Sequence, residues 1–165
     1  MPTCFRASVI LLHAVLEDLL RSTEQLRLPG AAPNAFERIR FLTPGQALKD
    51  GKEKFSLIDL AAYRGQSVDD VFYTAISGHL EHSNYNSIGE VKQALGRSGI
   101  AYAGTPIVSA TLEAMMRRRH LIAHRADMNP VSGRGHHVAQ SISKELVSSW
   151  ADVVESFGHG VVQNL

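Results

Sequence analysis

Apolar residues recur along this chain at intervals of three and four, and this helical spacing most constrains its fold. Between residues 3 and 26 the recurring positions are Val9, Leu12, Leu16, Leu19 and Leu20. Such a row lies along one face of an α-helix. Residues 137–157 carry a comparable row, from Val138 to Phe157. Nowhere do apolar and polar residues alternate as they do in a strand, so we expect an all-α protein.

Three helix starts are marked by capping residues. Ser67-Val68-Asp69-Asp70 and Ser87-Ile88-Gly89-Glu90 match capping boxes, and Thr105-Pro106 pairs an N-cap with proline at the first helical position. These signals predict an up-and-down bundle of four main helices, near 3–26, 67–81, 105–126 and 137–157. Shorter helices are expected near 34–41, 57–63 and 88–98, and Gly158 and Gly160 should end the last helix. We expect one domain, 1–165.

Composition indicates a cytoplasmic protein without a membrane segment. The 165 residues are 44% hydrophobic and 20% charged, which is ordinary for a globular domain. The apolar run 7–16 is interrupted by His13 and is too short to span a bilayer, and it lacks the small-residue cleavage site of a signal peptide. With Cys4 as the single cysteine, no intramolecular disulfide or thiolate zinc site is expected.

Basic residues gather in one stretch although the formal net charge is only +1. The stretch contains Arg117, Arg118, Arg119, His120, His124 and Arg125, and Arg134, His136 and His137 follow it. A local basic patch can attract a polyanion such as RNA. The alternative is an ordinary solvated helix face.

Arg119 interrupts the apolar row of the predicted helix 105–126. The row comprises Val108, Leu112, Met115, Ile122 and Ala126. A guanidinium in a core-facing row needs a partner or an opening, because an unpaired buried charge costs roughly several kcal/mol. Either Arg119 pairs with an acid of the first helix, such as Glu17 or Asp18, or the row lines a cleft or subunit interface that receives a phosphate.

His120 and His124 are four residues apart and therefore share a helix face. Two histidines at this spacing can bind a metal, but no acid occupies the position it has in H-E-x-x-H and no third ligand is evident nearby. Neutral histidine beside arginine suits acid–base chemistry on a ribose 2′-hydroxyl, with arginine offsetting the charge on the phosphate. RNA supplies both nucleophile and leaving group, so we expect no metal and no cofactor.

The stretch from Arg117 to Asp127 resembles the R-x(4–6)-H motif of HEPN domains. Arg119 and His124 give the x4 form, while Arg118 and Arg117 satisfy x5 and x6. The resemblance is closest to the RiboL-PSP-HEPN type of prokaryotic conflict systems. It extends upstream through 59–70 and 83–86, and downstream through 133–135 and the last helix with Trp150.

The resemblance implies a HEPN-like bundle, a homodimer that joins two copies of the motif, and an endoribonuclease that leaves a 2′,3′-cyclic phosphate. It makes Arg119 and His124 catalytic and His120 an accessory polar residue, with Arg117, Arg118 and Arg125 contacting RNA. A toxin or antiviral defence role is implied, with an antitoxin or defence-complex partner. The alternative is a catalytically silent HEPN module that binds RNA or nucleotide, or dimerises within such a complex.

Two features of the motif complicate this assignment. On a straight helix Arg119 and His124 lie about 140° apart, whereas Arg117 lies only about 20° from His124. Either Arg119 reaches round, the helix end distorts, or Arg119 of one subunit meets His124 of the other, and Arg117 is the reserve candidate. Ala126 stands where HEPN toxins silenced by AMP transfer carry a tyrosine, so that form of control is not expected.

Other sites have weaker support in the sequence. Tyr85, between Asn84 and Asn86, either stacks on a base or fills a turn. No G-x-S-x-G elbow and no glycine-rich phosphate loop is present.

Overall fold

Every regular element in the described part of the chain is helical. The computed structural model describes residues 2–37, 39, 57–102, 104–125 and 140–165. The α-helices are α1 (Pro2–Arg27), α2 (Leu57–Ala61), α3 (Val68–Glu81), α4 (Ile88–Arg97), α5 (Pro106–Arg125) and α6 (Lys144–Val162), and two 3-10 helices are η1 (Leu28–Gly30) and η2 (Pro33–Phe36). The prediction of an all-α bundle is confirmed.

The capping residues begin the helices as expected. The Ser67 side chain accepts a hydrogen bond from the Asp70 amide, and the Asp70 carboxylate accepts one from the Ser67 amide in return. Ser87 and Glu90 form the same reciprocal pair at the start of α4. These bonds satisfy amides that have no partner inside the helix.

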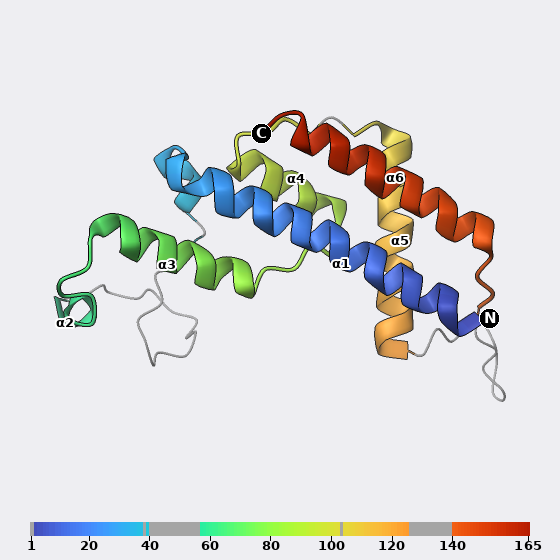
Figure 1. Ribbon diagram of the computed structural model, residues 1–165, viewed down its shortest axis with the longest axis horizontal. Helices are drawn as coiled ribbons and strands as arrows, with labels where there is room; N and C mark the ends of the chain where they lie inside the picture. Colours follow the sequence, from blue (N-terminus) through green and yellow to red (C-terminus); the bar gives the residue numbers. More distant parts are fainter. Residues whose placement is uncertain (1, 38, 40–56, 103, 126–139) are drawn as a thin grey trace.

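The longest helix, α1, is the centre of the arrangement and packs against α3, α4, α5 and α6. Figure 1 shows α4 and α6 running in the same direction as α1 and α3 running in the opposite direction. The same view shows α5 crossing α1 and α6 instead of lying alongside them, and α5 packs against both.

The core forms where these helices meet. Its main cluster draws buried side chains from four helices, among them Val9, Leu16, Leu20, Leu95, Leu112, Met115, Met116, Trp150, Val154, Phe157 and Val161. A second, smaller cluster under α3 contains Leu28, Ile76 and Leu80. The apolar rows read from the sequence are therefore the faces that pack together.

The boundaries of α6 differ from the prediction at both ends. Residues 140–143 precede the helix, which begins at Lys144 because Ser143 caps it by accepting a hydrogen bond from the Leu146 amide at 3.2 Å. Residues 137–139 lie outside the described residues. At the other end the prediction was wrong, since α6 continues through Gly158 and Gly160 to Val162.

Tertiary packing explains this extension of α6. Val161 is buried against the main cluster, and its burial stabilises the turn that contains both glycines. A Cβ at Gly158 would lie 3.4 Å from Leu19 Cδ2, so α6 approaches α1 closely at this point. Packing of this kind outweighs the roughly 1 kcal/mol that a glycine costs inside a helix.

In the predicted short helix 34–41, residues 34–36 form part of a 3-10 helix instead of an α-helix. Its described part is η2, which ends at Phe36, and residues 38, 40 and 41 lie outside the described residues. Within the described helices, none is both long enough and apolar enough to cross a membrane.

Candidate functional site

The apolar row of α5 passes through Arg119, as predicted. Leu112 and Met115 are buried in the main cluster and Ile122 packs against it. Arg119 follows Met115 by one turn and is half-buried. It faces inward, yet none of the described residues hydrogen-bonds to it or forms an ion pair with it. The row therefore carries a positive charge without an acidic partner from the described residues.

His13, on α1, is a buried histidine. His13 Nε2 lies 3.2 Å from the main-chain carbonyl oxygen of Tyr85 and donates to it, because a carbonyl oxygen only accepts. Burial lowers the pKa of His13; the Glu17 carboxylate opposes this shift, and the positive charge of Arg119 adds to it. His13 therefore stays neutral near pH 7.

The two acids considered as partners for Arg119 make other contacts or none. Glu17 Oε1 lies 3.7 Å from His13 Nδ1, and Glu17 Oε2 lies 3.8 Å from Arg21 Nη2. Asp18 is exposed. The described structure therefore does not show the acidic partner that would make Arg119 a simple packing residue.

His120 and His124 lie together on the last turns of α5. Their ring centroids are 4.6 Å apart, with the ring planes inclined at 44°, and both side chains are exposed. No described contact joins Arg119 to either ring, in keeping with the separation of about 140° between Arg119 and His124 on a straight helix. A single chain thus brings the two imidazoles together and leaves the guanidinium on another side of α5.

The other arginines of the motif have different surroundings. Arg117 is exposed. Arg118 is half-buried and donates hydrogen bonds to the side chain of Gln140 and to the main-chain carbonyls of Gln140 and Ser141. Arg125 is the last residue of α5 and its side chain lies outside the described residues, as do Arg134, His136 and His137.

A buried ionic network, which sequence reasoning missed, lies beside His13. Glu24 is fully buried; its carboxylate accepts a 2.6 Å hydrogen bond from the Tyr85 hydroxyl and a 2.7 Å bond from Arg97 Nε. Burial, followed by the Glu24 hydrogen bond, raises the pKa of Tyr85. Tyr85 therefore fills a turn and is not free to stack on a base. The available signal was Glu24 itself, which continues the row Leu16–Leu20 at the next helical turn.

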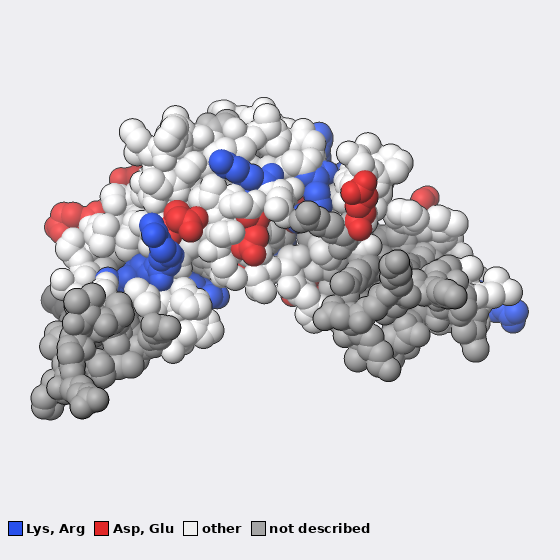
Figure 2. All heavy atoms as spheres, turned by 180° about the vertical axis from the view of Figure 1, so that it is seen from behind, with Lys and Arg blue, Asp and Glu red and all other residues white. Residues whose placement is uncertain are grey.

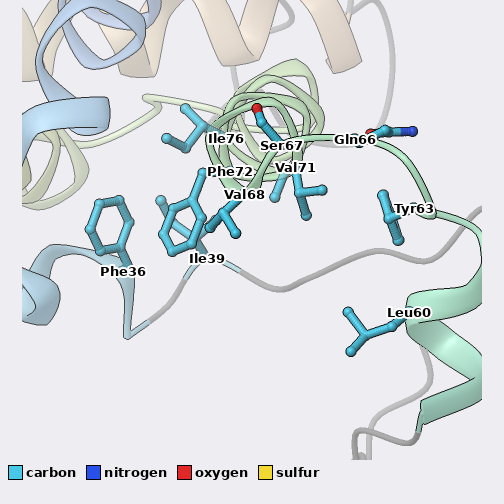
Figure 3. Close-up of a pocket in the computed structure, with 11 residues that line it drawn as sticks. Phe36, Ile39, Leu60, Tyr63, Gln66, Ser67, Val68, Val71, Phe72 and Ile76 are labelled. Carbon is cyan, nitrogen blue, oxygen red and sulfur yellow. The ribbon is translucent and has the colours of Figure 1, made fainter.

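An apolar cavity of about 600 Å³ lies elsewhere, between η2, α2 and α3. Figure 3 shows Phe36 and Phe72 side by side on its wall, with ring centroids 5.5 Å apart. Its described lining contains no histidine, arginine, lysine or acid. The described lining therefore offers no charged or imidazole group for acid–base or phosphate-binding chemistry.

Surface charge is mixed on the side opposite to the view of Figure 1. Figure 2 shows basic and acidic side chains interspersed on this face, without one continuous basic surface. Among the described residues no group of three histidine, cysteine or acidic side chains is placed to hold a metal ion. Comparisons with protein-family models, with curated proteins and with solved structures found no match.

Proposed function

We propose that this protein is a metal-independent endoribonuclease of a prokaryotic toxin or defence system. The observation that carries the proposal is the exposed pair His120–His124, with ring centroids 4.6 Å apart, which directly follows Arg119, an arginine that has no described acidic partner. The R-x4-H spacing inside the penultimate long helix of an all-α chain supports it. So does the resemblance of this segment to HEPN domains.

The chemistry requires only groups that the motif supplies. His124 accepts the proton of a ribose 2′-hydroxyl, and the 2′-oxygen attacks the adjacent phosphorus. The bond from phosphorus to the 5′-oxygen breaks, and that oxygen takes up a proton, delivered by an imidazolium such as that of His120 or by water. The products are a 2′,3′-cyclic phosphate and a 5′-hydroxyl. Arg119 offsets the charge that develops on the phosphate oxygens.

A second copy of the chain completes the proposed site. Arg119 and His124 face different sides of α5, so one phosphate does not readily contact both residues of one chain. In a homodimer, Arg119 of one protomer and His124 of its partner can contact the same phosphodiester. This proposal makes cleavage dependent on dimerisation, which an antitoxin or a defence-complex partner can control.

The contacts of the arginines favour one alternative function. Arg118 is hydrogen-bonded to Gln140 and Ser141, and Arg119 lies half-buried in the apolar row of α5. In this alternative, Arg118 and Arg119 stabilise the fold and do not contact a substrate. Arg117 and the exposed histidines bind RNA or nucleotide without cleaving it. This is the catalytically silent HEPN module.

Product analysis in EDTA tests the proposal and separates it from the alternative. Purified protein is incubated with end-labelled single-stranded RNA, and the new ends are identified. The proposal predicts cyclic phosphate and 5′-hydroxyl ends. Binding without cleavage favours the silent module, and cleavage that occurs only with added divalent ion contradicts the mechanism.

A further inference from the structure

Two exposed asparagines flank a buried tyrosine in the connector between α3 and α4. Tyr85 is 1% exposed, whereas Asn84 and Asn86 are both exposed. Neither side-chain amide is hydrogen-bonded to a described residue. A side-chain amide offers two N–H donors and a carbonyl acceptor. The connector therefore presents two sets of donors and acceptors at the surface that the described fold does not use.

Hydrogen bonds from α1 hold the backbone of this connector in place. Arg21 Nη2 donates to the main-chain carbonyl of Ser83 at 2.9 Å. His13 Nε2 donates to the main-chain carbonyl of Tyr85 at 3.2 Å, and the Tyr85 hydroxyl donates to the buried Glu24 carboxylate at 2.6 Å. Polar groups on a backbone that is already ordered lose less conformational freedom on binding, so they are suited to selecting a ligand.

The connector is also joined to α5, the helix that carries the exposed histidines. Glu113 Oε2 accepts a 3.0 Å hydrogen bond from the main-chain amide of Ile88, the first residue of α4. Ile88 follows Asn86 by two residues, so their Cα atoms are at most about 7 Å apart. The asparagines therefore lie close to the point where α4 meets α5.

Glu113 shares one face of α5 with His120 and His124. On a straight helix these three positions fall within about 40° of one another, and His120 lies about 10 Å beyond Glu113 along the axis. In the view of Figure 1 the end of α3 and the last turns of α5 lie on the same side of α1, and α4 lies on the other side. The connector thus starts on the side of α1 to which the histidine-bearing end of α5 extends.

We propose that Asn84 and Asn86 read an adenine base of single-stranded RNA beside the phosphate at which His124 acts. The inference rests on the proposed function. Unpaired bases can be hydrogen-bonded along their edges, and an asparagine amide matches the N6 donor and N7 acceptor of adenine in a bidentate contact. The two asparagines determine specificity and take no part in the proton transfers.

The test compares asparagines at two places on the surface. The test variant carries Asn84→Ala together with Asn86→Ala. The matched control is Asn34→Ala, which removes an exposed asparagine from η2. All three side chains are exposed, so both proteins should unfold close to the wild-type melting temperature. Thermal unfolding establishes this before activity is compared.

Mapped cut sites give the first readout. Single-stranded RNA of random sequence is cleaved in EDTA, and the ends are sequenced. Wild type and Asn34→Ala should prefer adenine at one fixed position beside the cut. The double variant should still cleave, with that preference reduced roughly tenfold, as loss of a bidentate base contact does. An absence of preference in wild type, or a preference that survives the double substitution, would overturn the inference.

Binding gives a second readout that does not depend on cleavage. Short oligoadenylate and oligouridylate are titrated into His124→Ala, with and without the two asparagine substitutions. Loss of the asparagines should weaken oligoadenylate binding roughly tenfold more than oligouridylate binding. Equal changes for the two RNAs contradict the inference. Adenine-dependent binding by a wild-type protein that never cleaves RNA refutes the nuclease proposal alone.

Discussion

The guanidinium of Arg118 donates a 2.8 Å hydrogen bond to the main-chain carbonyl of Gln140. Arg6 of α1 donates to the same carbonyl at 3.1 Å. Three consecutive arginines in the motif therefore differ in surroundings: Arg117 is exposed, Arg118 holds the segment before α6, and Arg119 faces the core.

This difference predicts that two adjacent substitutions affect different properties of the protein. Arg118→Ala removes the hydrogen bonds to Gln140 and Ser141 and should lower the free energy of unfolding by about 1–3 kcal/mol. Arg117→Ala should leave stability within about 0.5 kcal/mol of wild type and should weaken RNA binding. Denaturant unfolding and RNA titration of both variants check this. Equal stabilities of the two variants would contradict the assignment of Arg118 to the fold.

Helix boundaries could be predicted from the sequence where a capping residue determines them. They could not be predicted where tertiary packing determines them. Ser67, Ser87 and Thr105 begin helices by bonds within one turn, and those bonds can be inferred from sequence. The end of α6 depends instead on burial of Val161 against other helices. No local pattern around Gly158 and Gly160 reports that contact.

The candidate site, likewise, was predictable only where its residues lie close together in the sequence. The helical spacing of His120 and His124 predicts that they are neighbours, and the structure has them so. The effect of the Arg119 charge on His13 depends on how α5 packs against α1. Helical spacing within either segment does not predict that packing. The carboxylate of Glu24 was missed because its partners, Tyr85 and Arg97, lie 61 and 73 residues away in sequence.

The glycine at position 160 offers a direct test of the α6 boundary. Nothing lies within 4 Å of a Cβ added there, and the residue is inside the helix. Gly160→Ala should stabilise the protein by about 0.5–1 kcal/mol, because alanine loses less backbone entropy on folding. Gly99→Ala is the matched control; Gly99 has φ +71° after α4, and the same change there should destabilise. Loss of stability in Gly160→Ala would argue against a helix that continues to Val162.

Acid should destabilise the fold through His13. Burial lowers the pKa of His13, and burial followed by the charge of Arg97 lowers that of His79, both from an ordinary value of 6.5. The unfolded chain therefore binds more protons as the pH falls through about 6.5, and stability decreases below that pH. Melting temperatures at about pH 7.5 and 5.5 measure the decrease.

The matched variants for this experiment are His13→Gln and His159→Ala. His13→Gln should show a smaller fall in melting temperature between the two pH values, with the remainder due to His79. His159 is 73% exposed on α6 and serves as the surface control. Identical pH dependence in the two variants would show that His13 does not titrate in this way.

Complementation between inactive chains tests whether the site is shared. Arg119→Ala and His124→Ala proteins should each be inactive alone, because each lacks one proposed catalytic group. When the two are mixed and allowed to exchange, a heterodimer carries one intact Arg119–His124 site, and cleavage per heterodimer should return toward half of the wild-type rate per dimer. No recovery, despite exchange shown by labelled subunits, would contradict a site built across two copies.

The most direct test of the central claim is the rate of single-stranded RNA cleavage in EDTA by His124→Ala, measured beside His159→Ala. The account predicts that His159→Ala cleaves at the wild-type rate and that His124→Ala falls by roughly 10²-fold or more, as loss of a general base does. Equal cleavage by the two variants would contradict the account.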